Sequence, residues 1–177
     1  MKSLWSRYVY RGKVVSLRIE ELEFPSRRSV VEIVEHRGAV VIAAQPNPDS
    51  IVLVEQYRYP IGMRQWEVPA GTIDKDEEAD ACAARELREE TGYTAKKIRR
   101  LWSAYSAPGF CTELLHFYAA EDLTLGEREP DEGEEDMQVK TFTLDEAWAM
   151  IEGDKLRDAK SQVAIAWARA RRESKSG

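Results

Sequence analysis

Three glutamates, Glu86, Glu89 and Glu90, have the residue type and spacing that most clearly indicate chemistry in this chain. Helix-forming residues surround them, and i, i+3 and i+4 spacing places all three carboxylates on one face of a helix. Like charges so placed repel by about 0.2–0.5 kcal/mol per pair unless a cation lies among them. Oxygen ligands select a hard ion, so the spacing predicts a site for Mg²⁺, with Mn²⁺ as the alternative.

The surrounding residues predict a helix over 78–91. Asp74 or Asp76 is the expected N-cap, and Gly92 is expected to end the helix in the left-handed conformation. A solvated acidic helix is the competing interpretation, because Glu, Arg and Ala are good helix formers and adjacent glutamates are common.

A longer pattern separates the two interpretations. It runs from Gly71 through five residues to Glu77, through seven to Arg85-Glu86-Leu87, through one to Glu89-Glu90, and through one to Gly92-Tyr93. These residues fill every fixed position of the Nudix box, which rarely happens by chance. The chain therefore resembles the Nudix hydrolases. The resemblance implies Mg²⁺-dependent cleavage of a nucleoside diphosphate linked to a second group.

The resemblance also implies roles for the box residues. The metal ligands would be Glu86, Glu89, Glu90 and the backbone carbonyl of Ala70. Arg85 would act beside Glu89 in catalysis and, with Glu77, would fix the loop and the ligands. For Glu77, a direct metal contact and a helix-start carboxylate near the dipole both stay open.

An acid from a loop after the box is expected, by the same resemblance, to position the attacking water. The acidic segment 121–136 offers Glu129, Asp131, Glu132, Glu134, Glu135 and Asp136. We expect Glu135 to take this role, with Glu134 second, because Glu135 lies just before a predicted strand and at a family-like distance from the box. The other acids of this segment would be solvated.

Segments outside the box resemble the ADP-ribose pyrophosphatase branch of the Nudix hydrolases. They are Gln56-Tyr57-Arg58, Glu67-Val68-Pro69-Ala70-Gly71 and Ser106-Ala107-Pro108-Gly109. The residues expected to contact substrate are Arg58, Arg64, Glu67, Pro108, Gly109 and Glu113. Arg58 or Arg64 would meet phosphate, and Glu113 would hold a ribose or orient its loop. Pro108-Gly109 is also a plain turn, and Tyr8, Tyr10, Phe24 or Trp102 would either stack on adenine or pack in the core.

The order of predicted elements indicates an α/β fold. Strands are expected at 8–10, 14–24, 30–35, 40–44, 51–58, 97–104, 113–120 and 137–142, and further helices from Thr143 or Asp145 to 151 and from Asp158 or Ala159 to 172. The resemblance implies an α/β/α sandwich with a mixed sheet. We expect residues 1–36 to form a small antiparallel β extension, 37–173 the Nudix domain and 174–177 a frayed tail. Such an extension is not a stable unit alone, so it must pack on the main domain or on a second subunit. ADP-ribose pyrophosphatases place a similar sheet at a dimer interface, and by this resemblance we expect a homodimer. The alternative is that these strands only edge the core sheet.

Composition narrows the class of protein further. A net charge of −6 argues against binding nucleic acid or an anionic membrane. No apolar run is long enough to span a bilayer, and the first residues lack the apolar core of a signal peptide. Cys82 and Cys111 form no metal pattern and suggest a reducing cytoplasm.

These observations predict hydrolysis of the pyrophosphate bond of ADP-ribose, giving AMP and ribose 5-phosphate. Two alternatives remain: another nucleotide-sugar diphosphatase, and a Nudix module that senses ADP-ribose without cleaving it. The intact box and the absence of a basic helix-turn-helix pattern count against the sensor. A purely structural interaction protein would leave the clustered glutamates unexplained.

Overall fold

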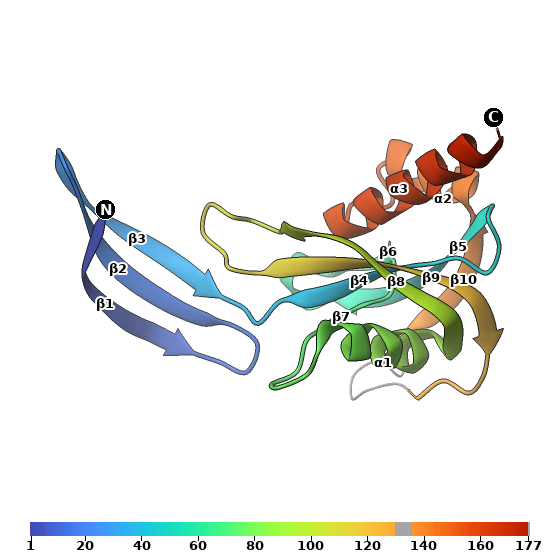
Figure 1. Ribbon diagram of the computed structural model, residues 1–177, viewed down its shortest axis with the longest axis horizontal. Coiled ribbons are helices and arrows are strands. Elements are labelled where there is room, and N and C mark those ends of the chain that lie inside the picture. Colours follow the sequence, from blue (N-terminus) through green and yellow to red (C-terminus); the bar gives the residue numbers. More distant parts are fainter. Residues whose placement is uncertain (130–135, 177) are drawn as a thin grey trace.

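Two sheets between helices form the body of the protein, which the computed structural model describes over residues 1–129 and 136–176 (Figure 1). The first sheet has the order β7-β4-β9-β8, in which β4 and β9 run parallel. Its strands are β4 (Ala39–Ala44), β7 (Ala70–Thr72), β8 (Tyr93–Tyr105) and β9 (Leu114–Leu125). The second sheet is antiparallel, with the order β10-β5-β6. Its strands are β5 (Ser50–Arg58), β6 (Met63–Glu67) and β10 (Gln138–Thr143).

Helices cover the sheets from two sides. α1 (Ala79–Thr91) lies on one side, and α2 (Leu144–Glu152) and α3 (Ala159–Ser176) lie on the other (Figure 1). β4 is buried along its whole length, as its unbroken apolar run predicts. Its even-numbered residues join the core under α1, and its odd-numbered residues join the core under α2 and α3. The expected α/β/α arrangement with a mixed sheet is therefore confirmed.

The N-terminal strands form a sheet of their own that projects from the body (Figure 1). It contains β1 (Lys2–Arg11), β2 (Ser16–Phe24) and β3 (Arg27–Glu35), all antiparallel. The expected antiparallel extension is thus present. Val34, near the end of β3, receives a hydrogen bond at its carbonyl from the Thr112 amide (2.9 Å) and donates one to the Phe110 carbonyl (2.8 Å). These bonds join the sheet to the loop between β8 and β9.

The start of α1 differs from the prediction. Its N-cap is Glu78, whereas Asp74 and Asp76 were the predicted caps. Asp76 has a φ of 65°, which lies outside helical geometry. The Asp74 amide donates to Glu77 Oε2 (3.0 Å), so these residues form a turn ahead of the helix. The C-terminal prediction is confirmed, since Gly92 is left-handed with a φ of 75°.

Other element boundaries differ from the predicted ones, because hydrogen bonding to a neighbouring strand determines where a strand ends. β9 extends to Leu125, which pairs with Tyr93, so part of the segment 121–136 is strand and not loop. The short strands β6 and β7 and a turn of 3₁₀ helix at Tyr59–Ile61 were not predicted. α3 continues past residue 172 to Ser176. α2 begins as expected after Thr143, which forms a capping box with Glu146.

Candidate active site

The structure brings the box glutamates to the buried side of α1. Cys82, Ala83 and Leu87 are fully buried and fix that face of the helix against the sheet. Glu86 and Glu90 lie at the edge of the same face and keep only 7% and 2% of their surface exposed. Burial of two carboxylates one turn apart is costly unless cations or hydrogen-bond donors meet them.

The backbone at Ala70 and Gly71 meets these two carboxylates. The Ala70 amide donates to Glu90 Oε2 (3.0 Å). A Cβ on Gly71 would lie 1.9 Å from the carboxyl carbon of Glu86, so any larger residue here would displace the Glu86 carboxylate from its observed position. The predicted ligands Ala70, Glu86 and Glu90 are thus adjacent.

Arg85 organises the remaining box residues. It forms two hydrogen bonds to Glu77 (2.8 and 2.9 Å) and contacts Glu86 (2.7 Å) and Glu89 (2.8 Å). The hydrogen bonds from Arg85 and from the Asp74 amide lower the pKa of Glu77 to about 2, although partial burial opposes this. Hydrogen bonding to Glu77 and Glu89 likewise raises the pKa of Arg85. Glu77 therefore links the loop before α1 to the helix.

We call Glu77, Arg85, Glu86, Glu89 and Glu90 the box cluster. Three of its four carboxylates, those of Glu77, Glu86 and Glu89, contact the Arg85 guanidinium, and Glu90 accepts from the Ala70 amide. Carboxylate oxygens are the ligands that a hard divalent cation prefers, so the cluster suits such an ion. Within the described residues, however, no three acidic, His or Cys side chains form a ready-made metal site. Glu86 and Glu89 are directed at Arg85 instead. An incoming ion would have to draw them away from the arginine.

A second charged cluster lies at the end of β6. Glu67 is 1% exposed and receives two hydrogen bonds from Arg58, both 2.7 Å, and one from Lys160 on α3 (2.5 Å). Lys160 also contacts Asp158 (2.9 Å). We call these four residues the Glu67 cluster. Burial alone would raise the pKa of Glu67, but hydrogen bonds from Arg58 and the charge of Lys160 lower it to about 2.

A cavity of about 510 Å³ is lined by residues of the Glu67 cluster and by the backbone that meets the box cluster. Ala70 and Gly71 line it beside the box cluster, and Arg58 and Lys160 line it beside the Glu67 cluster. We call it the Gly71 cavity. Glu113, Ser106 and Tyr105 contribute from the β8–β9 connection. The cavity therefore extends from the region of excess negative charge to the positively charged side chains of Arg58 and Lys160.

Lys160 and Asp158 were missed by the sequence reasoning. They lie in the first turn of α3 and immediately before it, where Asp158 Oδ2 accepts from the Ser161 amide (3.0 Å). The Val68 amide donates to Ser161 Oγ (2.8 Å) and fixes this helix start beside β6. A helix start was predicted at Asp158 or Ala159, but no sequence signal placed it beside Glu67.

Other predicted substrate residues lie in different surroundings. Arg64 contacts Glu55 (3.0 Å) and the Asp136 carbonyl (2.7 Å) and does not line the Gly71 cavity. Pro108 and Gly109 also lie outside that lining, in the loop that bonds to Val34. Glu113 lines the cavity and lies 3.6 Å from His36.

The aromatic residues that were expected either to stack on adenine or to pack in the core lie in two different places. Trp102 stacks on Phe117 with ring centroids 5.3 Å apart and packs against the core. Tyr8, Tyr10 and Phe24 belong to the N-terminal sheet, where Tyr8 lies under Arg11.

Glu134 and Glu135, the predicted water-positioning acids, lie outside the described residues, and so do Asp131 and Glu132. Residues flanking them are placed. Glu129 lies 3.5 Å from Arg88 of α1, and Arg128 donates to the Met137 carbonyl (2.8 Å). Both described flanks of the acidic segment are therefore held near α1.

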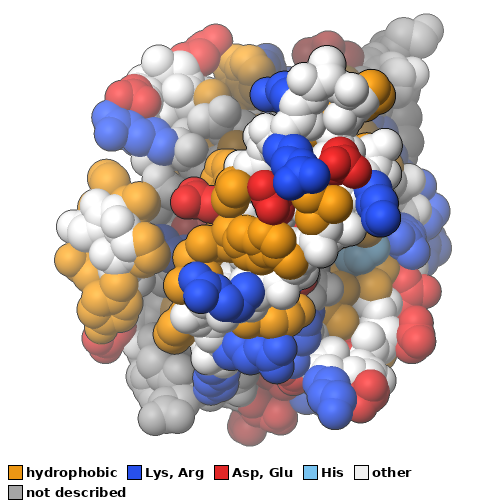
Figure 2. Space-filling model, turned by 90° about the vertical axis from the view of Figure 1, so that its left-hand side faces the viewer, with side chains coloured by type: hydrophobic (Ala, Val, Ile, Leu, Met, Phe, Trp, Pro, Cys, Tyr) orange, Lys and Arg blue, Asp and Glu red, His pale blue; other side chains and the backbone are white. Residues whose placement is uncertain are grey.

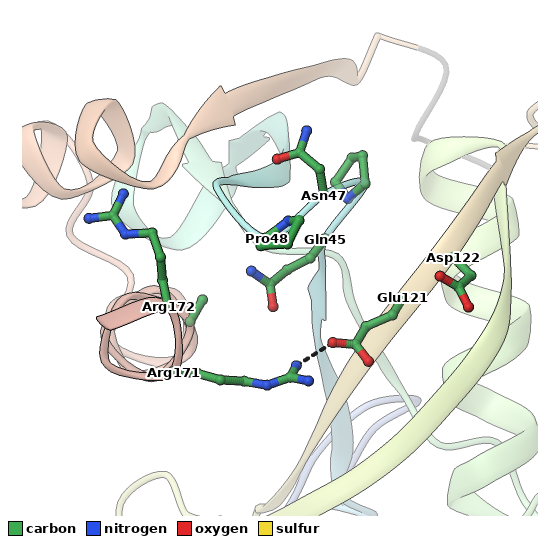
Figure 3. A pocket seen from close by; sticks show the side chains of 9 residues that line it. Gln45, Asn47, Pro48, Glu121, Asp122, Arg171 and Arg172 are labelled. Atoms are coloured by element: carbon green, nitrogen blue, oxygen red, sulfur yellow. Dashed lines mark hydrogen bonds and ion pairs between the residues drawn. The ribbon is translucent and has the colours of Figure 1, made fainter. Parts of the chain in front are cut away.

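A further cavity of about 340 Å³ is lined by residues that are distant from the box in the sequence (Figure 3). Gln45 and the turn that contains Asn47 and Pro48 face Arg171 and Arg172 of α3 across it. The arginines are already engaged there: Arg171 pairs with Glu121, and Arg172 bonds to Asp145 (2.8 Å). None of the box residues lines this cavity.

Comparison with known proteins agrees with this geometry. The model of the NUDIX domain matches residues 34–163. An ADP-ribose pyrophosphatase of Bacillus subtilis (strain 168) is 40% identical over 167 residues, covering 93% of this chain and 90% of that protein. A protein of Bacillus methanolicus described as a methanol dehydrogenase activator is 37% identical over 166 residues, with the same coverage. The crystal structure of an ADP compounds hydrolase superposes with a TM-score of 0.85 at 23% identity, covering 98% of this chain and 95% of that one.

The chain belongs to the NUDIX domain family. Its fold, its complete box and its similarity to these relatives agree on this. None of the described helices combines the length and the apolar composition that crossing a bilayer requires.

Proposed function

We propose that this protein is a Mg²⁺-dependent Nudix pyrophosphohydrolase that cleaves ADP-ribose to AMP and ribose 5-phosphate. The observation that carries the proposal is the excess of carboxylates over cations in the box cluster, beside a cavity whose other wall presents Arg58 and Lys160. The substrate rests on the relatives named above, of which the Bacillus subtilis protein is an ADP-ribose pyrophosphatase.

Glu86, Glu89, Glu90 and the Ala70 carbonyl are the proposed ligands of the divalent ion. When bound, the ion lowers the pKa of a water molecule and neutralises the charge that develops on the phosphate oxygens. In the reaction, water adds to one phosphorus and the bond from that phosphorus to the bridging oxygen breaks. The leaving phosphate takes up the charge, and the attacking water gives up its proton to a base.

Arg85 and Glu77 are the proposed positioning residues of this site. Their two parallel hydrogen bonds fix the loop before α1 and leave the second guanidinium edge for Glu86 and Glu89. Arg58, held by Glu67, is the proposed phosphate contact, and Glu113 the proposed ribose contact. We keep Arg64, Pro108 and Gly109 as proposed substrate residues. Arg64 holds the Asp136 carbonyl, and Pro108 and Gly109 lie in a turn in which the Ala107 carbonyl accepts from the Phe110 and Cys111 amides.

Glu135 is the proposed residue that positions the attacking water. The support is the described flank of its segment, where Glu129 lies near Arg88 and Arg64 holds the Asp136 carbonyl. Glu135→Gln should lower turnover and leave Mg²⁺ affinity unchanged. If Glu134→Gln has that effect and Glu135→Gln does not, the assignment moves to Glu134.

The N-terminal sheet is the proposed homodimer interface. It projects from the body and exposes large hydrophobic side chains, namely Trp5, Tyr8, Val9, Tyr10, Val14, Val15 and Val30. The view onto this end of the molecule shows hydrophobic side chains at the surface among Lys and Arg (Figure 2). A three-stranded sheet with exposed apolar residues gains stability by packing on a second copy.

Sedimentation tests the dimer directly. The full chain should sediment as a dimer, and a chain lacking residues 1–34 should not. A well-behaved monomer of the full chain across the micromolar range would refute this interface. We also propose a cytoplasmic location, since Cys82 and Cys111 are both free thiols.

The activity is tested by incubating the protein with Mg²⁺ and a panel of nucleoside diphosphate sugars while products are separated by chromatography. ADP-ribose should be consumed fastest, with AMP and ribose 5-phosphate appearing together. Faster cleavage of another nucleotide sugar would keep the chemistry and replace the substrate. Binding of ADP-ribose without cleavage of any member would instead make the protein a sensor.

A further inference from the structure

The cavity of Figure 3, which we call the Gln45 cavity, lies where the parallel pairing of β4 with β9 ends. Ala44 pairs with Ala120 there, and Gln45 and Glu121 follow directly. In open α/β sheets, ligands commonly bind beyond the carboxyl ends of parallel strands. The box lies toward the opposite end of β4, where Gly71 pairs with Val40. The Gln45 cavity is therefore separate from the proposed active site.

Gln45 is the feature of this cavity that indicates a ligand. It is only 7% exposed, and among the described residues nothing hydrogen-bonds to its side-chain amide. Figure 3 shows this amide directed into the space between Arg171, Arg172 and Glu121. A buried amide that loses its hydration without gaining partners costs free energy. A bound molecule that offers both a donor and an acceptor would satisfy it.

Helix α3 supplies the positive charge of the Gln45 cavity. Ala168 is 1% exposed and packs α3 against the core. Arg171 and Arg172 follow it by three and four positions, so they lie on the same face of the helix and line the cavity. Arg171 Nη1 donates to Glu121, and within the described part of the chain its Nε and Nη2 donate to no acceptor. These N–H groups are available to an anion.

The ion pairs around the cavity do not prevent an anion from binding. Asp145, which pairs with Arg172, has a side chain that is 65% exposed, so water screens this pair and it contributes little. A phosphate monoester carries up to two negative charges and accepts parallel bonds from a guanidinium, so it competes well with such a carboxylate. Asp122, the second acid of the lining, pairs with Lys97 (2.9 Å).

The rest of the lining limits the kind of molecule that fits. Its apolar part consists of Pro46, Pro48 and Ala168, and no aromatic ring in the described lining could stack on a base. The volume of about 340 Å³ lies at the lower end of the range of roughly 300–1,000 Å³ for small-molecule sites. Glu121 and the Gln45 carbonyl can accept from hydroxyl groups. These features suit a small hydroxylated anion better than a nucleotide.

We propose that the Gln45 cavity binds a sugar phosphate, with the phosphate on Arg171 and Arg172 and the sugar hydroxyls on the Gln45 amide and Glu121. The chemical class follows from the cavity itself. Ribose 5-phosphate is the member of this class that the proposed reaction releases, so its choice as the ligand rests on the proposed function.

Isothermal titration calorimetry of the full chain without Mg²⁺ tests this site. Ribose 5-phosphate should bind at least about tenfold more tightly than inorganic phosphate, ribose or AMP, because only it meets both the arginines and the amide without adding a base. Gln45→Met removes the amide at similar volume. It should weaken ribose 5-phosphate about tenfold and change the affinity for inorganic phosphate less than about threefold. Arg171→Met should weaken both ligands about tenfold or more.

Two control variants separate this site from the active site. Gln65→Met replaces another buried glutamine, 6% exposed, which lines a separate cavity beside the Glu67 cluster, and it should keep the wild-type affinity for ribose 5-phosphate. Glu90→Gln alters the box cluster and should also keep that affinity. Conversely, Gln45→Met should keep the wild-type kcat for ADP-ribose. Thermal unfolding shows whether each variant is folded.

The outcomes distinguish this inference from the proposed function. Failure of ribose 5-phosphate and of glucose 6-phosphate to bind the wild-type protein would overturn the site, whether or not ADP-ribose is cleaved. Tighter binding of glucose 6-phosphate would keep the sugar-phosphate class and replace ribose 5-phosphate as the ligand. Binding that persists in folded Gln45→Met and Arg171→Met would place the ligand elsewhere and overturn the assignment. Binding as predicted, without cleavage of any nucleotide sugar, would refute the proposed function alone.

Discussion

The box cluster and the Glu67 cluster are both centred on an arginine that makes two hydrogen bonds to one glutamate, but they differ in charge balance. Arg85 binds Glu77 and also forms ion pairs with Glu86 and Glu89, so the carboxylates around it carry excess negative charge. Arg58 binds Glu67, which Lys160 also contacts, so no carboxylate is in excess there. We therefore propose that the unbalanced cluster recruits an ion and that the balanced cluster forms a fixed wall beside the substrate.

The two clusters should therefore respond in opposite ways to removal of a carboxylate. In the box cluster, loss of a negative charge relieves repulsion and removes an ion ligand, so activity should fall while stability is kept. In the Glu67 cluster, loss of the carboxylate leaves two cations together, one of them 17% exposed, so stability should fall. The predictions below test this contrast.

The largest expected effect is that of Glu90→Gln. The amide oxygen can still accept from the Ala70 amide, but the ion loses a charged ligand, so kcat should fall about 10³-fold or more. The unfolding temperature without Mg²⁺ should stay equal or rise, and its increase on adding Mg²⁺ should shrink. Glu78→Gln is the control, because Glu78 makes no side-chain cap bond, and it should keep activity. Wild-type turnover in Glu90→Gln would contradict the metal site.

Glu67→Gln should have the next largest effect. Arg58 and Lys160 would share a neutral amide, and the free energy of unfolding should fall by about 3 kcal/mol, measured by urea denaturation. The matched control is Glu55→Gln, which breaks the more exposed pair with Arg64 and should cost less than about 1 kcal/mol. Equal losses in the two variants would remove the distinction between buried and exposed pairs.

Arg85→Lys tests the positioning role of the box arginine. Lysine cannot make two parallel bonds to Glu77 and also reach Glu86 and Glu89, so the Mg²⁺ concentration for half-maximal activity should shift about 10- to 100-fold. Arg88→Lys is the control, since the ion pairs of Arg88 with described residues are longer, 3.8 Å to Glu89 and 3.5 Å to Glu129. An unchanged Mg²⁺ dependence in Arg85→Lys would assign the arginine a purely structural role.

Low pH should reduce the free energy of unfolding that the ionised glutamates of both clusters contribute. The pKa of Glu67 and of Glu77 falls from 4.5 to about 2 on folding, so the folded state favours the ionised form. This contribution is complete above the unfolded pKa and is lost as pH falls from 4.5 through 2. Unfolding free energies should drop by about 1 kcal/mol per group between neutral pH and the middle of that window. In Glu67→Gln the drop should be about half as large, and an unchanged drop would exclude Glu67 as its source.

The box could be located from the sequence because its parts are local. Glu86, Glu89 and Glu90 lie on one helix, and helical spacing alone fixes which residues share a face. Gly71 and Glu77 belong to the same segment. The position of the helix agrees with the prediction to within one residue, but its N-cap is Glu78, because Asp74 and Glu77 form a turn ahead of the helix.

The other half of the site could not be located in this way. Lys160 is brought to Glu67 by the packing of α3, through the bond from the Val68 amide to Ser161. Arg64 was one of two arginines expected to meet phosphate, and its contacts with Glu55 and Asp136 depend on strand pairing that no local pattern specifies.

The sequence by itself determined the helix, the glycine and the set of carboxylates that an ion would need, because these follow from residue type and the period of one helix. Only the tertiary structure decided that a balanced ion cluster from β5, β6 and α3 stands opposite the box, with a cavity on either side. The physical reason is that the ion-pair partners of a buried charge are brought to it by the packing of elements that are distant in the sequence. That packing depends on the whole core.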